Sequence, residues 1–585
     1  MTKRWCIKTQ TEEALRTQEM LENELKLNPI ICKLLIQRGI TSAIGVRKFF
    51  KPSLNELHDP FLMQDMHKAV KRLNKGLGNN EKILIYGDYD VDGTSAVALV
   101  YRFLRPYSTL LDYYIPDRNG EEYGLSIKGI DFAVEQGFKL IIVLDCSIKA
   151  IDQVNYAKEK GIDIIICDHH MPDDTLPDAL AILDPKRPDS EYPYEHLSAC
   201  GVGFKFMQAF AMSNDISFST LECLLELTAI SIASDIVPLT GENRILAYFG
   251  LRQLNYNPSI GLKGIIKTSG LTGKDLTISD IVFKIGPRIN ASGRMKNGRE
   301  AVELLLARDE KSASEKSANI DQYNDERREM DRKITEEANY IIDKLIDIED
   351  HKGIVLYDPK WHKGVIGIVA SRLTEKYYRP AVVLTKSPDP VTGSDLTNGS
   401  DLITGSARSI IGFDMYKAIE NCRDLLENFG GHTYAVGLSL RENNLPAFIE
   451  RFMKIASDEI TPEQMTPQID IDAHITLKDI NASLMNDLKK MNPFGPDNEK
   501  PVFASRHVKD FGTSRVVGRD GMHLKLELID DSSKIPVHAI AFGMSEHEKF
   551  LRDSNPIDIC YTIEENVYNG QTSIQLLIKD IRPSF

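Results

Sequence analysis

The stretch KILIYGDYDVDGT (residues 82–94) joins a short apolar run to three aspartates at alternate positions, Asp88, Asp90 and Asp92. The apolar run predicts a buried strand, and alternate spacing in the extended loop after it places the carboxylates on one side. Like charges this close repel one another unless a cation lies between them. The stretch therefore predicts a metal site, against two alternatives: an Asp-rich turn without metal, and a calcium loop, which lacks its final acid because that loop position is Leu99.

Three more apolar runs reach an aspartate at their ends: KLIIVLD (139–145), DIIICDHH (163–170) and ALAILDP (179–185). Short β-branched runs separated by helical stretches indicate a parallel sheet that is covered on both faces. In such α/β folds the site lies beyond the carboxyl ends of the strands. We therefore expect one rim of the sheet to carry Asp88, Asp145, Asp168 and Asp184.

Further candidate ligands follow these runs. His169 and His170 come directly after Asp168, and because adjacent residues point in different directions, one can bind a metal ion while the other faces a substrate phosphate. Asp145 could bridge two ions, and Asp235 in the segment ASDIVP supplies another acid. Carboxylates with imidazole suit Mn²⁺, or Mg²⁺ where oxygens dominate. Two such ions about 3.5–4 Å apart would activate water and stabilise a phosphoryl displacement.

Composition sets limits on the class of protein. The chain has 585 residues, and because single cores stop growing near about 250–300 residues, we expect several domains. No apolar run approaches the roughly 20 residues of a membrane span, and the eight cysteines form no CxxC pair, so we expect a cytoplasmic protein that does not enter a membrane. The net charge of −14 argues only mildly against nucleic acid, because a local groove can remain basic.

Changes of pattern divide the chain into five segments. Residues 1–60 are expected to form short helices that lead into an α/β domain at 61–307. Residues 308–347 lack Gly and Pro and are dense in charge, which predicts one long helix, as a strut between domains rather than only a solvated surface helix. A second, smaller α/β domain is expected at 348–460, and short alternating runs at 461–585 predict a β-barrel of the oligonucleotide-binding (OB) type.

Several motifs, in this order, resemble a known family. A resemblance to the DHH phosphoesterase superfamily is carried by GDYDVDG (87–93), Asp145, DHH (168–170) and SDIVP (234–238). It narrows to the RecJ nucleases, with their DHHA1-type second domain, through GPRINASGRM (286–295), HKGVIGIVASR (362–372), GSARS (405–409) and GGHTYAVG (430–437). The OB barrel of that family is similar to NPFGPDNEKPVF (492–503) and HLKLEL (523–528). The match covers nearly the whole chain.

The resemblance implies a set of metal ligands: Asp90, Asp92, Asp145, His169 and Asp235, with Asp88 as an additional ligand or close neighbour. It also implies that His170 contacts the scissile phosphate. Two positions depart from the family pattern. Tyr86 stands where superfamily pyrophosphatases carry a further His ligand, so one or two ions of Mn²⁺ or Mg²⁺ are expected. Ser147 follows Cys146 where Cys-Gly is usual, a change that we do not expect to alter ligation.

The same resemblance implies contacts to substrate phosphates by Arg118, Arg288, Asn290, Arg294, Arg372, Ser406, Arg408 and His432. The residues of GSARS, with Arg118, would form a pocket for a 5′ phosphate. Those of GPRINASGRM stand on a predicted Gly-Pro-rich loop, where a guanidinium can bind phosphate through two hydrogen bonds. Arg372, like His362, either contacts substrate or supports the domain fold. A surface salt bridge is the alternative for each arginine taken alone.

The resemblance also implies a function. Such a chain would remove 5′-mononucleotides from single-stranded DNA in the 5′-to-3′ direction, by attack of metal-activated water on the phosphodiester, in DNA repair and recombination. A narrow cleft would exclude duplex, and the barrel would hold the downstream strand. We expect a monomer, with single-strand-binding protein and a RecQ-type helicase as partners. The alternatives are a DHH-family phosphodiesterase that acts on short oligonucleotides or cyclic dinucleotides, and an inactive relative that serves as a scaffold.

Overall fold

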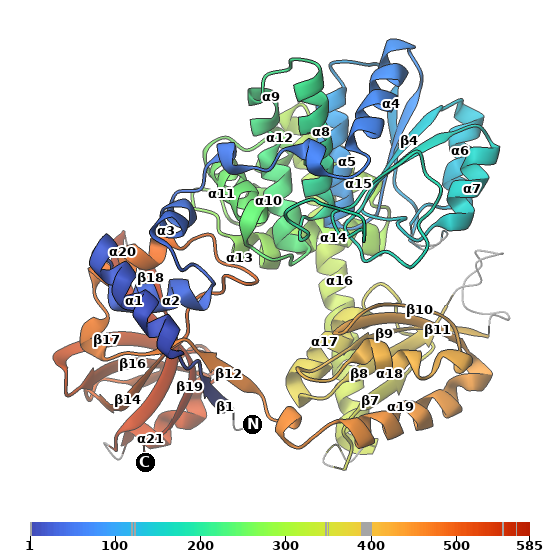
Figure 1. The fold of residues 1–585 in the computed structure, drawn as a ribbon. Coiled ribbons are helices and arrows are strands. Elements are labelled where there is room, and N and C mark those ends of the chain that lie inside the picture. The colour runs from blue at the N-terminus through green and yellow to red at the C-terminus, as the bar shows by residue number, and fades with distance from the viewer. Residues whose placement is uncertain are drawn as a thin grey trace. The chain divides into compact units, whose positions relative to one another are not determined.

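The computed structural model describes residues 3–118, 121, 124–345, 348, 350–387, 401–552, 555–568 and 570–584. These residues divide into two compact units, which we call the central unit (57–465) and the terminal unit (1–56 together with 466–585). Figure 1 shows the elements of both units, and both chain ends belong to the terminal unit. None of the described helices combines the length and the apolar character that crossing a membrane requires.

The first sheet of the central unit has five parallel strands in the order β3-β2-β4-β5-β6. Four of them confirm the predicted apolar runs: β2 (Ile83–Gly87), β4 (Leu140–Leu144), β5 (Asp163–Cys167) and β6 (Ala181–Leu183). The fifth, β3 (Leu111–Tyr114), is an edge strand that we did not predict. Only every second residue of β3 is buried, so its sequence has no continuous apolar run.

The register of this sheet brings the predicted aspartates into one row. The last residues of β2, β4, β5 and β6 are Cα partners of one another. The next residue after each strand is one of the predicted set, Asp88, Asp145, Asp168 or Asp184. The strand order reverses between β2 and β4, which is where ligands bind in doubly wound sheets.

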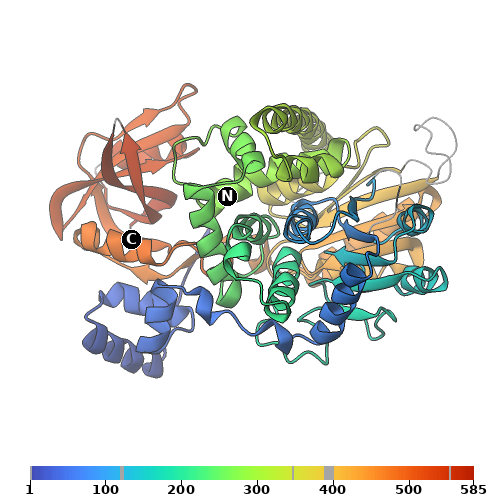
Figure 2. The ribbon, with the colours of Figure 1, turned by 90° about the horizontal axis from the view of Figure 1, so that it is seen from above.

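Helices cover both faces of this sheet (Figures 1 and 2). One face carries α6 (Ile127–Gln136) and α7 (Ile151–Glu159). The other face carries α5 (Val91–Leu104) and α8 (Ala199–Ser213), and α10 (Leu225–Ser234) packs on these two helices. Further helices of this part are α4 (Met66–Gly78), α9 (Ser219–Glu222), α11 (Gly241–Tyr256), α12 (Ile260–Thr268), α13 (Ile278–Asp280) and α15 (Arg299–Leu305).

The GPRINASGRM segment forms helix α14 (Gly286–Met295) rather than the Gly-Pro-rich loop that we predicted. Pro287 lies in the first turn, where its missing N–H costs no hydrogen bond. One turn of π-helix (Ile281–Ile285) precedes it. The glycines allow close packing instead, because a Cβ at Gly293 would lie 2.5 Å from the carbonyl oxygen of Tyr89 in the Asp-rich loop. Helix α14 therefore packs directly on that loop.

Helix α16 (Glu310–Leu345) confirms the predicted long helix, and its 36 residues span about 54 Å at 1.5 Å per residue. One stripe of the helix is buried, and it consists of Ala313, Ser317, Ile320, Asn324, Asp331, Ile334, Ala338 and Ile342. The helix packs against α12, α14 and α15 of the first part and against α17 (Ile366–Tyr377) of the second. It therefore connects the two sheets of the central unit (Figure 1).

The second sheet of the central unit has the order β10-β11-β9-β8-β7, and only β7 and β8 run parallel. Its strands are β7 (Ile354–Tyr357), β8 (Ala381–Lys386), β9 (Leu402–Arg408), β10 (Leu426–His432) and β11 (Ala435–Arg441). Alternate residues of β8 face different layers. One set packs against α18 (Met415–Glu420) and α19 (Leu445–Glu459), and the other against α16 and α17.

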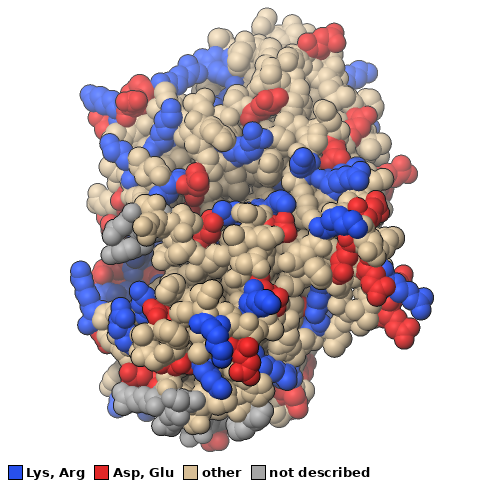
Figure 3. Space-filling model, turned by 90° about the vertical axis from the view of Figure 1, so that its left-hand side faces the viewer, with Lys and Arg blue, Asp and Glu red and all other residues tan. Residues whose placement is uncertain are grey.

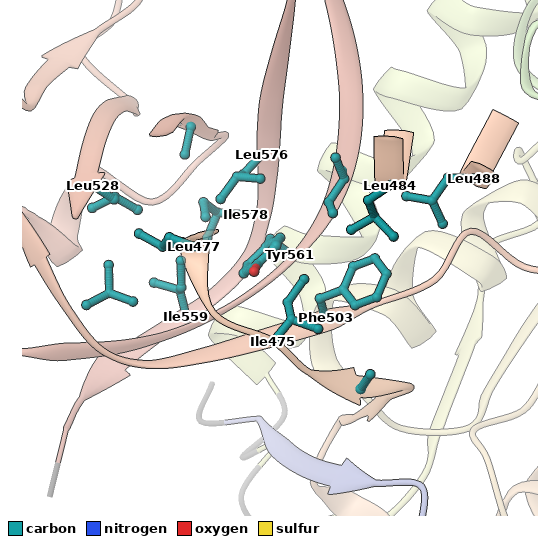
Figure 4. Close-up of a cluster of buried hydrophobic side chains, with 14 of the residues drawn as sticks. Ile475, Leu477, Leu484, Leu488, Phe503, Leu528, Ile559, Tyr561, Leu576 and Ile578 are labelled. Carbon is teal, nitrogen blue, oxygen red and sulfur yellow. The ribbon is translucent and has the colours of Figure 1, made fainter. Parts of the chain in front are cut away.

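The C-terminal part of the terminal unit is a mostly antiparallel β structure. Its strands are β12 (Gln468–Ile471), β13 (Ala473–His474), β14 (Phe503–Asp510), β15 (Arg515–Val517), β16 (His523–Asp530), β17 (Ser533–Ala541), β18 (Ile557–Tyr568) and β19 (Gln571–Pro583). Because β14 pairs with both β18 and β16, the strands β14, β18, β19, β17 and β16 form a ring of pairings, as expected of an OB-type barrel. Figure 4 shows apolar side chains of the core, among them Phe503, Leu528, Tyr561 and Leu576.

The N-terminal segment belongs to the terminal unit, although we expected it to lead into the first domain. Strand β1 (Arg4–Ile7) pairs in parallel with β12, and three helices follow it: α1 (Glu12–Leu25), α2 (Pro29–Gln37) and α3 (Ala43–Phe50). Buried residues of these helices, such as Leu21 and Leu35, share one apolar cluster with α20 (Ala482–Lys490) and the barrel strands. The difference has a physical reason: short amphipathic helices must bury their apolar stripes, and the barrel core provides the surface.

Candidate active site

The Asp-rich loop turns sharply from β2 into α5. Asp88 is buried, Asp90 is the N-cap of α5 and accepts a hydrogen bond from the Gly93 N–H at 3.1 Å, and Asp92 lies in the first turn. A side chain at position 93 is excluded, because a Cβ there would lie 2.5 Å from the carbonyl oxygen of Asp88. The loop therefore holds three carboxylates at a helix N-terminus, whose dipole favours negative charge.

Asp92 is fixed in addition by the start of another helix. Its carboxylate accepts hydrogen bonds from the N–H groups of Ala199 and Cys200, the first residues of α8, and from the Ser231 hydroxyl, each at 2.8 Å. Burial and the charge of Asp90 nevertheless raise the pKa of Asp92 to about 6. Ser231 was not predicted as part of the site, because a serine within an apolar helix belongs to no recognisable motif.

Asp145 stands at the end of β4 in a left-handed backbone conformation, with φ 66°. Ser147 is left-handed as well, with φ 85°, and this is the position where the family pattern has glycine. The Ser147 Oγ accepts a hydrogen bond from the Leu125 N–H at 3.1 Å, which offsets part of the strain. Left-handed residues other than glycine cost roughly 1–2 kcal/mol each, so this turn stores strain beside the buried Asp145 carboxylate.

His169 lies among three of the predicted ligands. Its Nε2 is 3.4 Å from Asp145 Oδ1, 3.5 Å from Asp235 Oδ2 and 3.8 Å from Asp92 Oδ2. Both ring nitrogens are buried and have no hydrogen-bond partner among the described residues. Burial, followed by the charge of His170, lowers the pKa of His169 to about 3, so the ring is neutral and offers a lone pair to a cation.

Three groups of side-chain atoms lie close enough to hold a cation; one of them combines Asp145 and His169 with His170, and the other two share no residue. The members of these two, whose ligand atoms lie within 4.8 Å of one another, are Asp92, His169 and Asp235 in one group and Asp88, Asp90 and Asp145 in the other. Because Asp145 is also 3.4 Å from His169, it is within reach of both groups. The buried Asp88 Oδ1 has no hydrogen-bond partner among the described residues. Burial and neighbouring carboxylates raise the pKa of Asp88, Asp145 and Asp235 well above the usual range, so these residues fit divalent cations.

His170 and Asp168 form an ion pair at the rim of this site. His170 Nδ1 lies 2.7 Å from Asp168 Oδ1, and Asp168 also accepts the N–H groups of His169 and Ile148. Although burial opposes its charge, the bond to Asp168 raises the pKa of His170 to about 9, so the ring is cationic at neutral pH. Asp184 belongs to neither cation group; burial raises its pKa to about 7, and it accepts the Lys186 N–H at 2.7 Å.

Tyr86, which replaces a histidine ligand of superfamily pyrophosphatases, belongs to the core. Its side chain is fully buried, and its hydroxyl donates a hydrogen bond to the Gly124 carbonyl at 2.7 Å. Its ring stacks on that of Tyr114, with 5.3 Å between the centroids. The cation group of Asp88, Asp90 and Asp145 is therefore formed without a ligand from position 86.

Four arginines gather beside the carboxylates, and we call them the arginine cluster: Arg118, Arg294, Arg327 and Arg408. Burial and the charges of the other three lower the pKa of Arg294 to about 10. Its Nη1 donates to the Gly364 carbonyl at 2.9 Å, and the Arg118 guanidinium lies 5.0 Å from the centre of the Tyr89 ring. Arg408 Nη1 donates to Ser406 Oγ at 2.9 Å. The sequence did not single out Arg327, because it lies within the charge-dense helix α16.

The remaining predicted phosphate contacts have other partners. Arg288 and Arg372 form ion pairs with acids of α16, Asp321 at 2.7 Å and Asp331 at 2.6 Å. His362 Nδ1 accepts the Gly364 N–H at 3.1 Å. The His432 ring faces that of His170, parallel within 6° and with 6.5 Å between the centroids. Asn290 is half-buried on α14.

Comparison with known proteins agrees with this geometry. The DHH family, N-terminal domain, matches residues 82–232, the DHHA1 domain matches 350–458, and the RecJ OB domain matches 471–580. The single-stranded-DNA-specific exonuclease RecJ of Bacillus subtilis is 35% identical over 578 residues, which cover 99% of this chain and 70% of that protein. The chain belongs to the RecJ family.

Other RecJ proteins are similar along most of their length. RecJ of Haemophilus influenzae is 31% identical over 97% of this chain and 98% of that protein. The crystal structure of Thermus thermophilus RecJ in complex with Mn²⁺ shares the fold, with a TM-score of 0.83 at 23% identity, over 100% of this chain and 80% of that one. The same protein has been crystallised with Mg²⁺. These are the two ions that the carboxylates and imidazole of this RecJ-family chain predict.

Proposed function

We propose that this RecJ-family chain removes 5′-mononucleotides from the 5′ end of single-stranded DNA, with two divalent cations, Mn²⁺ or Mg²⁺. Its RecJ relatives are single-stranded-DNA-specific exonucleases, and RecJ structures hold these ions. One observation carries the proposal. Asp145 is within reach of both cation groups, and Arg118 of the arginine cluster lies close enough to Asp88 to influence its charge.

The proposed ligands are Asp92, His169 and Asp235 for one cation and Asp88 and Asp90 for the other, with Asp145 between them. Divalent cations so placed lower the pKa of water and stabilise the charge that develops on a phosphoryl group. The chain contributes rigidity. Asp92 is held by two backbone N–H groups of α8, and Asp145 by the strained turn after β4. Ligands fixed in this way need little rearrangement when substrate binds.

His170 is proposed to contact the scissile phosphate. Its bond to Asp168 through Nδ1 leaves Nε2 protonated and able to donate to a phosphate oxygen. The elevated pKa keeps this charge at neutral pH. The His432 ring lies parallel to that of His170, with 6.5 Å between the centroids, so a phosphate at the edges of the two rings would be within reach of both.

The arginine cluster, with Ser406, is proposed to bind the 5′ phosphate. Four guanidinium groups that form no ion pair within the described part of the chain favour a dianion, which the terminal phosphate provides and an internal phosphodiester does not. The N-terminus of α17 lies directly against Ser406, because a Cβ at Gly367 would be only 2.9 Å from Ser406 Oγ. The dipole of α17 therefore adds partial positive charge to this pocket. A strand held by its 5′ end would present its first phosphodiester to the cations, which gives both polarity and stepwise release.

The barrel of the terminal unit is proposed to hold the downstream strand. The rings of Phe511 and Phe542 are 49% and 58% exposed, and the Phe542 ring lies 5.2 Å from that of His523. Arg515 and Lys525 are cross-strand partners on β15 and β16 and add positive charge. Exposed aromatic rings stack with bases, and basic side chains follow the phosphates without regard to sequence.

The proposal extends to partners and compartment. Single-strand-binding protein and a RecQ-type helicase follow from the family resemblance alone, as does action as a monomer. A cytoplasmic setting is supported by the eight cysteines, which are all free in the structure.

The test is digestion of DNA labelled at either its 5′ or its 3′ end, single-stranded or duplex, in the presence of Mn²⁺. We expect release of labelled mononucleotide only from the 5′-labelled single strand, and no release by the Asp145→Ala variant. Equal degradation from 3′ ends, or full activity in the variant, would contradict the proposal. Turnover confined to dinucleotides or cyclic dinucleotides would favour the alternative phosphodiesterase.

A further inference from the structure

A pocket with a volume of about 1160 Å³ lies in the central unit, away from the carboxylates. One wall is the C-terminal end of α5, with Tyr101, Arg102 and Arg105. Helix α5 begins at Asp90 and is 14 residues long, so this wall is about 20 Å from the metal ligands at 1.5 Å per residue. The other walls are the start of α12, the end of α15 and the start of α16. None of the residues in the two cation groups lines this pocket.

The pocket is cationic, although the chain carries a net charge of −14. Its charged lining residues are Arg102, Arg105, Arg308 and Lys316, against the single acid Glu303. Arg102 is neutralised by the buried Glu226 at 3.0 Å, and Lys316 by Glu303. Arg105 donates only to the Ser108 carbonyl, and within the described part of the chain neither it nor Arg308 has an acidic partner. Figure 3 shows, by contrast, a face on which Lys and Arg are scattered among Asp and Glu.

The start of α12 adds unsatisfied polar groups to this wall. Ser259 is the N-cap, but its side chain makes no capping hydrogen bond. Its buried Oγ has no partner among the residues that the structure describes, while its N–H donates to Glu226 at 2.9 Å. The Glu226 carboxylate therefore already lies at the start of α12, and the attraction of this pocket for an anion comes from Arg105 and Arg308.

The rest of the lining is aromatic and apolar. The Tyr101 and Tyr113 rings lie edge to face, with 5.5 Å between their centroids. Ile260, Leu305 and Leu306 add apolar surface. A ligand for this pocket therefore carries negative charge at one end and a flat or apolar group at the other, which excludes inorganic phosphate as the best fit.

We propose that this pocket binds a nucleoside phosphate at a site separate from the catalytic centre. Arg105 and Arg308 bind the phosphate, and the base lies against Tyr101 and the apolar wall. A volume of about 1160 Å³ is ample for a mononucleotide, since pockets for small molecules span roughly 300–1,000 Å³. The mononucleotides that the proposed exonuclease releases have the required chemistry, but the assignment rests on the pocket and not on that reaction.

The test uses a fluorescently labelled deoxyadenosine monophosphate and the full chain in EDTA, where metal ions do not recruit nucleotide to the carboxylates. The probe titrations are made in an Arg408→Ala background, which weakens the proposed 5′-phosphate pocket. We expect binding to persist in this background and to weaken at least tenfold when Arg105→Ala and Arg308→Ala are added. The matched control is Arg252→Ala, an exposed arginine on α11 that is outside the pocket, and it should change binding less than twofold.

Two further measurements keep the outcome clear. Unlabelled nucleotide should displace the probe better than inorganic phosphate, deoxyadenosine or an acidic peptide, and 8-azido-deoxyadenosine monophosphate should crosslink the unsubstituted chain near Tyr101. Loss of all binding on Arg408→Ala alone, or equal displacement by phosphate or the peptide, would overturn the proposal. If the double variant unfolds, Arg308→Glu at its exposed position gives the same test. End-labelled DNA digestion by the unsubstituted chain reports separately on the exonuclease.

Discussion

The carboxylates at the rim of the first sheet and the arginine cluster beside them are two groups of like charge. In both, burial and then the neighbouring like charges work against the charged state: they raise the pKa of Asp145 and lower that of Arg294. The acids match a cation, and the arginines match a phosphate. Under the proposed function, the carboxylates would hold the metal ions and the arginines would bind the 5′ end of the strand.

The groups differ in how they are held. The carboxylates are short side chains fixed by strand ends, an N-cap and the N–H groups of α8. The arginines are long side chains from four separate segments, and Arg327 Nε is buried without a partner in the described residues. We infer that the cation site is formed before substrate binds, whereas the phosphate pocket is completed by it.

Substitution of the shared carboxylate should have the largest effect. Asp145→Asn removes the one acid within reach of both cation groups, and we expect activity on 5′-labelled DNA to fall on the order of 10³-fold or more. By comparison, loss of a residue that only hydrogen-bonds to a metal ligand reduces activity by about 10–100-fold. Without metal the same variant should melt at a higher temperature, because a buried charge among like charges is removed. Activity above a tenth of the original, or a lower melting temperature in EDTA, would contradict this account.

Removal of one arginine should have an intermediate effect. Arg408→Ala is expected to reduce the preference for a 5′-phosphorylated over a 5′-hydroxyl strand by about 10–100-fold, the value of one charge-assisted contact. Hydrolysis of a bound strand should change much less. The preference is measured as the ratio of kcat/KM for the 5′-phosphorylated strand to kcat/KM for the 5′-hydroxyl strand.

Arg372→Ala is the matched control for this experiment. Arg372 already has an ionic partner in the buried Asp331, so its loss should lower stability by about 1–3 kcal/mol and leave the 5′-phosphate preference unchanged. If both variants lose the preference equally, Arg372 belongs to the phosphate pocket after all.

Proton competition should make metal binding depend on pH. The pKa of Asp92 is raised in the folded state to about 6. In the absence of metal, protonation of Asp92 therefore stabilises the folded state fully below about pH 4, and this stabilisation is lost as the pH rises through about 6. Mn²⁺ needs the deprotonated form, so its affinity should rise roughly tenfold per pH unit between pH 5 and 6 for each proton released. The increase in melting temperature caused by Mn²⁺ should be larger at pH 7.5 than at pH 5. An equal increase at both values would show that these carboxylates are not the ligands.

The strained turn after β4 predicts the smallest effect. Ser147→Gly relieves a left-handed residue, worth about 1–2 kcal/mol, but loses the acceptor for the Leu125 N–H, worth about 0.5–1.5 kcal/mol, so stability should change little. Ser147→Ala keeps the strain and loses the bond, and should be less stable by about 1 kcal/mol or more. Urea unfolding in EDTA measures both. Equal stability of all three chains would mean that neither the strain nor the bond matters here.

Local sequence predicted the parts of the site that depend on local structure. Apolar runs ending in aspartate placed Asp88, Asp145, Asp168 and Asp184 on one rim, because strand register follows from a parallel sheet. The same reasoning did not distinguish ligands from neighbours: Asp168 holds His170, and Asp184 is in neither cation group.

The parts that depend on distant packing could not be predicted in this way. Arg327 joins the arginine cluster only because α16 packs on α14 and α17. Neither the left-handed backbone at Ser147 nor its hydrogen bond with the Leu125 N–H was predicted, because both depend on packing around the turn. The glycines of α14 were misread as a loop, because glycine that allows close packing and glycine that allows a turn look the same in sequence.

The pairing of β1 with β12 has a consequence for biosynthesis. Arg4 and Gln468 are cross-strand partners separated by 464 residues, and translation at about 5–20 residues per second takes roughly 25–90 s to cover that distance. The central unit can leave the ribosome and fold during this time. The N-terminal helices, whose apolar residues such as Ile31 and Leu35 share one buried cluster with α20 and the C-terminal strands, cannot complete this core in the same time. The apolar side chains of these helices therefore remain exposed until the C-terminal strands have been synthesised. Truncation of those strands should unfold the N-terminal helices.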